Sequence, residues 1–303
     1  MIRILVIALA CAVPDLASAQ RLEIQPVAEG VWAIVGETAQ RSPENLGNNA
    51  TFGLVTTPEG AVLIDPGGSW KGAAALHDAI RTVTEQPVVY VIDTGGQDHR
   101  WLGNGYWQAQ GATVIASAAA VEDQAARGSM QMTALAGFLG DALAGTEPAF
   151  ADITFADRYT LALGGLSLEI VHVGPAHTPG DSFVWMPRAR TVFTGDIVYI
   201  GRLLGIGPQS SVAGWPLAFE AVAALDPAHV IPGHGPATTL DRARAETFDY
   251  LTNLREKIGA LIEEGGDIMD APSVDQSAFS HLEQFDSLAG RNAQSAFEQM
   301  EWE

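Results

Sequence analysis

The sequence predicts a layered α/β fold in which two β-sheets pack face to face and helices lie on the outside. Two observations lead to this prediction. Each half of the chain begins with several strand candidates and continues with helical segments. No repeat, low-complexity tract or linker separates the halves, so we expect a single layered domain to contain both.

The first half contains apolar or alternating runs that end at turn residues, which is typical of strands. These runs span residues 30–35, 49–57, 61–65, 88–93 and 112–116. Helices are expected over residues 71–83, 102–110 and 118–143. The order strand, loop, helix, strand between residues 88 and 116 is the βα pattern of layered α/β proteins.

The second half starts with β structure again. Strands are expected over residues 153–155, 159–163, 166–173, 182–186, 191–194 and 229–232. Helices are expected over residues 215–225 and 240–263. The last forty residues, 264–303, are rich in polar residues, and we expect them to form a partly ordered C-terminal extension.

The composition limits the possible partners. The chain of 303 residues is 47% hydrophobic, enough to bury a sizeable core, and its 36 acidic and 16 basic residues give a net charge of −20. So acidic a surface repels nucleic acid and anionic membranes, and we expect neither as a partner. Solubility alone or the binding of cations would each account for the acidity. No segment after the N-terminal region is long and apolar enough to span a membrane.

The N-terminal residues 1–19 have the pattern of a secretory signal peptide. Arg3 precedes a short apolar run over residues 4–13, and Ala17-Ser18-Ala19 forms a small-residue cleavage signal. A lipoprotein signal around Cys11 and a buried N-terminal helix are the alternatives. We therefore expect a periplasmic or secreted protein whose main domain spans residues 20–263. Cys11 is the only cysteine, so the mature chain would have neither a disulfide nor a thiolate ligand.

Four short segments place possible metal ligands directly after predicted strands. These ligands are Asp98 and His99, then His177, then Asp196, and finally His234. Imidazole nitrogen and carboxylate oxygen are the ligands that zinc prefers when no thiolate is available. Taken singly, each segment is equally consistent with a turn, a helix cap or a hydrogen-bonded loop histidine. All four in this order are far more specific.

This order of motifs resembles the metallo-β-lactamase superfamily, whose loops read roughly H-x-H-x-D-H, G-H-T-x-G-D, T-G-D and P-G-H-G. The matching segments here are DH at 98–99, AHTPGD at 176–181, TGD at 194–196 and PGHG at 232–235, with LIDPG at 63–67 as the supporting early strand. The resemblance covers roughly residues 29–254. It implies an αββα sandwich of two mixed sheets, with the metal site at one edge.

The first motif departs from the family pattern. Thr94 and Gly96 stand where the family has its first two histidines, and a shift of one residue would put Gly95 and Gln97 there instead. Neither alignment supplies a histidine. In the family, these two histidines help to bind the first of two metal ions.

The resemblance then assigns the remaining ligands. In the family, the residues matching Asp98, His99 and His234 bind the second metal ion, the residue matching His177 binds the first, and the residue matching Asp196 bridges both. The first site would keep only His177 and a share of Asp196. We therefore predict one zinc ion, held at the second site.

The resemblance implies a metal-dependent hydrolase that uses a metal-activated water on an ester, thioester or lactam-like bond of a small-molecule substrate. Asp98 or His177 would act as a catalytic base, or His177 would be free to bind substrate. Tyr199 and Trp101 are candidates to line the pocket. The main alternative is a non-catalytic periplasmic binding protein on the same scaffold. An iron-dependent oxygenase fits less well, because it would use the damaged first site.

Overall fold

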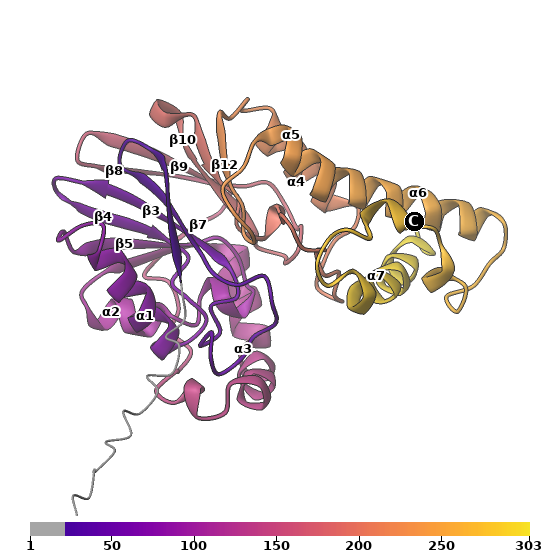
Figure 1. Cartoon of the computed structure of the whole chain (residues 1–303), viewed down its shortest axis with the longest axis horizontal. Helices are drawn as coiled ribbons and strands as arrows, with labels where there is room; N and C mark the ends of the chain where they lie inside the picture. Colours follow the sequence, from indigo (N-terminus) through magenta and orange to yellow (C-terminus); the bar gives the residue numbers. More distant parts are fainter. Residues whose placement is uncertain (1–21) are drawn as a thin grey trace, which may run out of the picture.

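Two β-sheets face each other in the computed structural model, which describes residues 22–303 (Figure 1). Helices cover the outer faces of the sheets, so the predicted αββα sandwich is confirmed. The expected signal peptide at residues 1–19 lies outside the described residues. Between residues 22 and 303, no helix combines the length and the apolar character needed to cross a bilayer.

The first sheet has seven strands in sequence order. They are β1 (Glu23–Ala28), β2 (Val31–Val35), β3 (Thr51–Thr57), β4 (Gly60–Ile64), β5 (Val88–Asp93), β6 (Thr113–Ser117) and β7 (Ile153–Phe155). Neighbouring strands from β1 to β4 are antiparallel, and those from β4 to β7 are parallel.

The second sheet has five strands in the order β12-β11-β10-β9-β8. They are β8 (Arg158–Leu163), β9 (Leu166–His172), β10 (Ser182–Met186), β11 (Thr191–Phe193) and β12 (His229–Ile231). Only β11 and β12 are parallel, so their carboxyl ends meet at one edge of the sheet. That edge carries two of the predicted ligands.

Up to residue 263, the helices follow the sequence prediction closely. They are α1 (Trp70–Arg81), α2 (Asn104–Ala109), α3 (Ala118–Leu139), α4 (Gly214–Ala223), α5 (Leu240–Ala243), α6 (Asp249–Glu263) and α7 (Phe285–Met300). A π-helical turn joins α5 to α6, so residues 240–263 form the continuous helix that the sequence predicts. The side-chain hydroxyl of Ser69 caps α1, and that of Ser117 caps α3.

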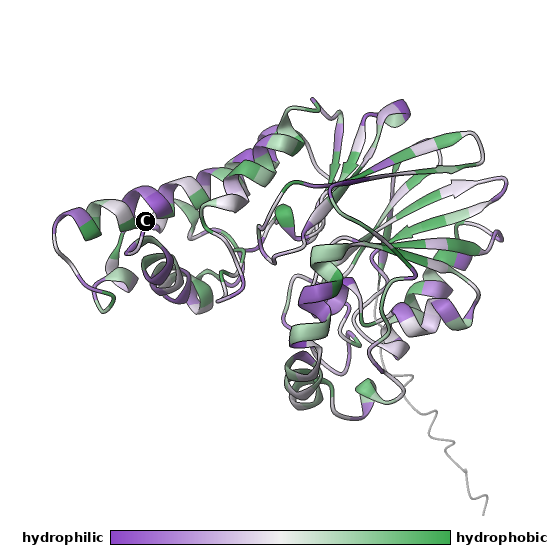
Figure 2. Ribbon diagram, turned by 180° about the vertical axis from the view of Figure 1, so that it is seen from behind, coloured by the Kyte–Doolittle hydropathy of each residue, from purple (hydrophilic) through white to green (hydrophobic). Residues whose placement is uncertain are grey.

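The alternation of side chains along the strands builds the core between the sheets. On β4, Val62 and Ile64 face the second sheet, whereas Leu63 packs under α1 and α2 on the outer face. Figure 2 shows the resulting concentration of apolar residues on the strands. On β3, Gly53 leaves room for the ring of Phe193 from the opposite sheet. This close approach packs the two sheets against each other near the end of β11, beside the candidate site.

The structure adds three features to the sequence prediction. The strand β1 was not predicted, because its sequence EIQPVA is interrupted by polar residues and a proline and lacks an apolar run. The strand β7 belongs to the first sheet rather than to the second, since α3 returns the chain to the edge beside β6. The C-terminal extension is also more ordered than expected: α7 buries Ala293, Ala296 and Phe297 in one cluster with residues of α6. Together α6 and α7 extend away from the sandwich (Figure 1).

We predict that Gly53→Ala destabilises the protein, because the new Cβ would overlap the ring of Phe193 and force the sheets or the ring to move. Overpacking of this kind costs about 1–3 kcal/mol of unfolding free energy. Thermal denaturation followed by circular dichroism should therefore show a lower melting temperature. Gly137→Ala in α3 is the control, because nothing lies within 4 Å of its added methyl group. A Gly53→Ala protein as stable as the wild type would contradict this account of the sheet packing.

Candidate metal centre

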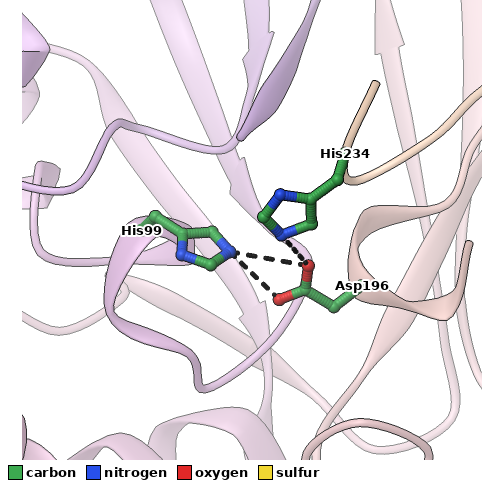
Figure 3. A group of neighbouring side chains, drawn as sticks. All are labelled: His99, Asp196 and His234. Atoms are coloured by element: carbon green, nitrogen blue, oxygen red, sulfur yellow. Dashed lines mark hydrogen bonds and ion pairs between the residues drawn. The ribbon is translucent and has the colours of Figure 1, made fainter. Parts of the chain in front are cut away.

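Three buried side chains, those of His99, Asp196 and His234, meet at one edge of the sandwich (Figure 3). The Nε2 atom of His99 lies 3.2 Å from Oδ2 of Asp196, and Nε2 of His234 lies 3.1 Å from Oδ1 of the same carboxylate. Each residue offers a ligand atom within 4.8 Å of the other two. The structure thus brings together three of the five predicted metal ligands.

Strand ends of both sheets position these side chains. His99 lies in a short 3₁₀ turn after β5 of the first sheet. Asp196 lies in a similar turn after β11, and His234 follows β12. Gly233 packs so closely on the carbonyl of Gly195 that a Cβ atom there would collide with it. The loops after the parallel strands β11 and β12 can approach each other only because this residue is a glycine.

A buried arginine lies directly beneath the three ligands. Arg100 donates from Nη2 to Oδ1 of Asp196 and to the carbonyl oxygen of Gly233, each at 2.7 Å. Its Nη1 donates to Oδ2 of Asp65 at 2.7 Å and to the carbonyl oxygen of Thr51 at 3.1 Å. The guanidinium therefore connects the end of β4 and the start of β3 to the loops of the second sheet.

This arginine keeps Asp196 ionised. Burial alone would raise the pKa of the Asp196 carboxyl, but the charge of Arg100 and then that of His99 lower its pKa well below the usual range. Burial alone would lower the pKa of Arg100, but the negative charges of Asp196 and Asp65 outweigh burial and raise its pKa. The site thus holds a permanent carboxylate between two imidazole rings.

Asp98, also a predicted ligand, faces a different partner. Its Oδ2 accepts a 2.5 Å hydrogen bond from Nε of Arg41, and Nη2 of Arg41 bonds to Oδ1. The same Oδ1 accepts from the backbone N–H of His99 at 2.8 Å and lies 3.0 Å from Nδ1 of the His99 ring. Burial would raise the pKa of Asp98, but Arg41 and His99 together lower it. Asp98 therefore contacts the far side of the His99 ring and lies outside the group of three.

His177, the fifth predicted ligand, also lies apart from the group. Its Nδ1 lies 3.1 Å from the carbonyl oxygen of Gly205, and its ring packs against Tyr199 and Trp215. Burial, only partly offset by Asp196, lowers the pKa of His177 to about 4. The ring is neutral at pH 7, so its bond to a carbonyl makes Nδ1 the donor and leaves Nε2 as an acceptor.

Thr94 and Gly96 stand at the two absent histidine positions when the motif is aligned on Asp98-His99, and both are closely packed. The hydroxyl of Thr94 donates to Asp65 at 2.8 Å, so this residue supports the partner of Arg100. A Cβ atom on Gly96 would collide with the carboxylate of Asp123, which is paired with Arg127 of the same helix, α3. In the loop that precedes His99, the packing therefore favours the residues present here over the two histidines of the family pattern.

The side chains of α3 hold that loop in place. The carbonyl oxygen of Gly96 accepts a 2.8 Å hydrogen bond from Nε2 of Gln131 and a 3.2 Å bond from Nη2 of Arg127. The carbonyl of Gly95 accepts from Nε2 of Gln124 at 3.1 Å. A glycine-rich loop would otherwise be mobile, and these bonds fix the approach to Asp98 and His99.

The ligand atoms of His99, Asp196 and His234 suit a zinc ion. Two imidazole nitrogens and one carboxylate oxygen are ligands that zinc accepts, and three protein ligands leave a fourth position open. Nδ1 of His99 lies 3.0 Å from both Nη2 of Arg41 and Oδ1 of Asp98. When Nε2 carries no proton, it is an acceptor that faces a carboxylate oxygen of Asp196 3.2 Å away. A cation between these two acceptors satisfies both of them.

A cavity of about 220 Å³ opens over the group. His99, His177 and His234 line it together with Tyr199, so this predicted pocket residue is placed at the site. Trp101, the other candidate, is fully buried and donates to Gln131 instead.

The arginines of the site were not predicted from the sequence. Arg100 directly follows the Asp98-His99 pair, and this position beside two predicted ligands is a signal that could have identified it as a residue of the site. Arg41 offered no signal, because it lies 57 residues before Asp98 in an irregular segment.

Comparisons with known proteins agree with this geometry. The model of the metallo-beta-lactamase superfamily matches residues 47–234. A metallo-beta-lactamase type 2 from Bacteroides fragilis is 31% identical over 85 residues, which are 27% of this chain and 34% of that protein. A 2,4-dinitroanisole O-demethylase subunit alpha from a Nocardioides species is 26% identical over 78 residues, 26% of this chain and 24% of that protein. The chain thus matches only about a third and a quarter of the length of these two relatives.

Solved structures share the fold over a larger part of the chain. A metallo-beta-lactamase from Pontibacter korlensis is 26% identical with a TM-score of 0.62, and the match covers 77% of this chain and all of that one. The metallo-beta-lactamase FIM-1 from Pseudomonas aeruginosa, in its mono-zinc form, is 21% identical with a TM-score of 0.58. That match covers 73% of this chain and 91% of the other, and at this identity it supports the fold alone.

The family match spans more than half of the chain and contains every predicted ligand, from the Asp98-His99 pair to His234, where it ends. The same residues lie at the edge of an αββα sandwich, and three of them converge on one point. The chain therefore belongs to the metallo-beta-lactamase superfamily.

Proposed function

We propose that this protein is a metal-dependent hydrolase that binds one zinc ion through His99, Asp196 and His234 and cleaves an ester, thioester or lactam-like bond of a small molecule. The convergence of these three buried donors beneath an open cavity is the observation that carries the proposal. Membership of the superfamily supports the general reaction class. We further propose that residues 1–19 direct the chain to the periplasm or out of the cell.

When bound, zinc supplies a Lewis acid that activates water at neutral pH. The remaining work falls to residues of the chain. Arg100 and His99 keep Asp196 ionised, so the carboxylate is ready to bind a cation without first losing a proton. Asp98 and its partner Arg41 both contact Nδ1 of His99 at 3.0 Å and fix the orientation of the ring from that side. Carboxylates commonly support metal-binding histidines in this way.

His177 positions substrate or water in this proposal. Because its Nδ1 donates to the carbonyl of Gly205, Nε2 is available only as a hydrogen-bond acceptor. With a pKa of about 4, the ring is a weak base at neutral pH. His177 is therefore better suited to orienting an O–H or N–H group in the cavity than to storing a proton.

The packing of the loop before His99 supports a single metal ion. When the motif is aligned on Asp98-His99, two ligand positions of the first site hold Thr94 and Gly96, and a shift of one residue would place Gly95 and Gln97 there instead. The carboxylate of Asp123 fills the space into which a side chain at Gly96 would extend. His177 alone supplies too few ligand atoms to hold a second metal ion tightly.

A specific observation also favours a second candidate, a periplasmic binding protein without catalytic activity. Arg100 already neutralises Asp196 through a 2.7 Å hydrogen bond, so the buried carboxylate has a cationic partner even when no metal is present. Metal analysis separates the two candidates, because the binding protein has no need of zinc.

For the hydrolase, we expect the purified protein to carry one equivalent of zinc, measured by atomic emission after dialysis. His234→Ala removes one of three ligands and should lose both the zinc and any esterase, thioesterase or lactamase activity. His281→Ala, at an exposed histidine far along the chain, is the control and should retain both. Two equivalents of zinc would overturn the single-ion proposal, and a protein that never binds metal would favour the binding protein.

Asp98 and Asp196 should differ in their effect on zinc affinity. Asp196→Asn removes a ligand charge and should abolish tight binding. Asp98→Asn removes only the support of the His99 ring, for which a loss of roughly 10- to 100-fold is expected. Competition with a chromophoric chelator measures both affinities. Equal losses in the two variants would show that Asp98 is released by Arg41 and binds the ion directly.

A further inference from the structure

Arg41 holds one of the predicted metal ligands, Asp98, through both of its carboxylate oxygens. Nε of Arg41 donates to Oδ2 at 2.5 Å, and Nη2 donates to Oδ1. The ion pair is largely shielded from water, because 16% of the Arg41 side chain and 7% of the Asp98 side chain are exposed. Bidentate, charge-assisted pairs of this kind are the strong ones among protein hydrogen bonds. Asp98 is therefore already bound by a cation.

The same guanidinium contacts the ring of His99. Nη2 of Arg41 lies 3.0 Å from Nδ1, whereas Nε2, on the other side of the ring, faces the carboxylate of Asp196 (Figure 3). A guanidinium can only donate, so it binds Nδ1 when that atom carries no proton, and a neutral ring then has its proton on Nε2. In that tautomer, Nε2 donates to Asp196 and has no lone pair for a metal ion. Arg41 thus opposes metal binding at two of the predicted ligands.

A buried asparagine fixes the segment that carries Arg41, an irregular stretch between β2 and β3. The side chain of Asn45 donates from Nδ2 to the carbonyl oxygen of Gln40 at 2.8 Å and accepts from the backbone N–H of Ser42 at 2.9 Å. These two residues are the sequence neighbours of Arg41, and Asn45 itself is fully buried. The backbone on both sides of Arg41 is therefore held in place, and the guanidinium is directed at Asp98.

The carboxylates of the site have cationic partners without any metal ion. Arg100 neutralises Asp196, and Arg41 neutralises Asp98. A zinc ion at the three converging side chains would lie close to both guanidinium groups, and like charges repel strongly at short range in a protein interior. The superfamily resemblance assigns Asp98 to this ion. Zinc and Arg41 therefore require the same carboxylate.

We propose that Arg41 sets the zinc affinity of this protein by competing with the ion for Asp98. Arg41 keeps Asp98 out of the ligand set, and its removal lets Asp98 join the three converging side chains as a fourth ligand. Arg41 is a positioning residue, because it acts through Asp98. The inference rests on the proposed function only for the presence of zinc at this site. A site weakened in this way fills and empties as the surrounding zinc concentration changes.

Competition for zinc with a chromophoric chelator tests the proposal without a substrate. Arg41→Met should bind zinc roughly 10- to 100-fold more tightly than the wild type, which is the size of effect that neighbours of metal ligands commonly have. Arg41→Lys keeps the charge but cannot bond to both oxygens as a planar fork does, so its affinity should lie between those two.

Arg291→Met is the matched control for the loss of a positive charge from the same cavity. Arg291 lines the cavity from α7, is exposed and forms no ion pair within residues 22–303. Its neighbour Asn292 bonds this helix to the domain, because Nδ2 donates to the carbonyl oxygen of Leu204 at 2.8 Å. Arg291→Met should change the zinc affinity much less than Arg41→Met does. Equal gains in the two variants would contradict the proposal, because they would show that charge alone controls the affinity.

A double-mutant cycle tests whether Arg41 acts through Asp98. In the Asp98→Asn background, Arg41→Met should no longer tighten zinc binding, because no carboxylate is left to release. With cobalt(II) in place of zinc, the visible spectrum of Arg41→Met should differ from that of the wild type, since the number of protein ligands changes. The double variant should lack this difference.

Thermal melting gives a readout that needs no chelator. Metal-free Arg41→Met should melt at a lower temperature than the metal-free wild type, because the buried charge of Asp98 has lost its partner. Zinc should raise the melting temperature of this variant by more than that of the wild type, since tighter binding stabilises the folded state further. Circular dichroism checks folding, and Arg41→Lys decides the matter where Arg41→Met does not fold.

The possible outcomes separate this inference from the proposed function. An unchanged or weaker zinc affinity in Arg41→Met would overturn the inference alone, and so would an equal gain in the double variant. A protein that binds zinc as expected here but hydrolyses no substrate would leave the inference intact and count against the hydrolase. Zinc binding by Arg41→Met and not by the wild type would support the inference in its strongest form. No zinc binding by either protein would overturn both.

Discussion

The buried guanidinium of Arg100 is the interaction on which the site depends. It bonds to Asp65 at the end of β4 and to Asp196 after β11, so one cation connects strand ends of both sheets. Its additional bonds to backbone carbonyls fix the loop that carries His234. Two carboxylates and one arginine in the interior are stable only as a hydrogen-bonded set, because each charge alone would face a large desolvation penalty.

The sequence predicted the parts of the site that depend on local signals. Apolar strands that end in glycine-containing loops identified His99, Asp196 and His234, and the order of motifs identified the fold. The ends that carry Asp196 and His234 converge because β11 and β12 are parallel neighbours, a pairing that only the structure shows. The ligand assignment of Asp98 and His177 stays a prediction, since their side chains face Arg41 and the carbonyl of Gly205.

The contacts that the sequence could not predict join residues that are far apart in the chain. Asp98 meets Arg41 across 57 residues, and Asp65 meets Arg100 across 35, with no motif that relates the partners. The steric block at Gly96 comes from Asp123 on a separate helix, so it becomes visible only when α3 is packed on the loop. The polar C-terminal segment gave no indication that one of its asparagines reaches into the domain.

The C-terminal helix α7 contributes to the cavity lining from a part of the chain that is far from the candidate metal ligands. The candidate metal ligands lie in the loops after β5, β11 and β12, whereas Arg291 is carried on a helix that Asn292 bonds to the domain. Substitutions in the last forty residues can therefore change part of the cavity wall without touching the three converging side chains. The wall of the cavity and the candidate ligands are thus encoded by separate parts of the sequence.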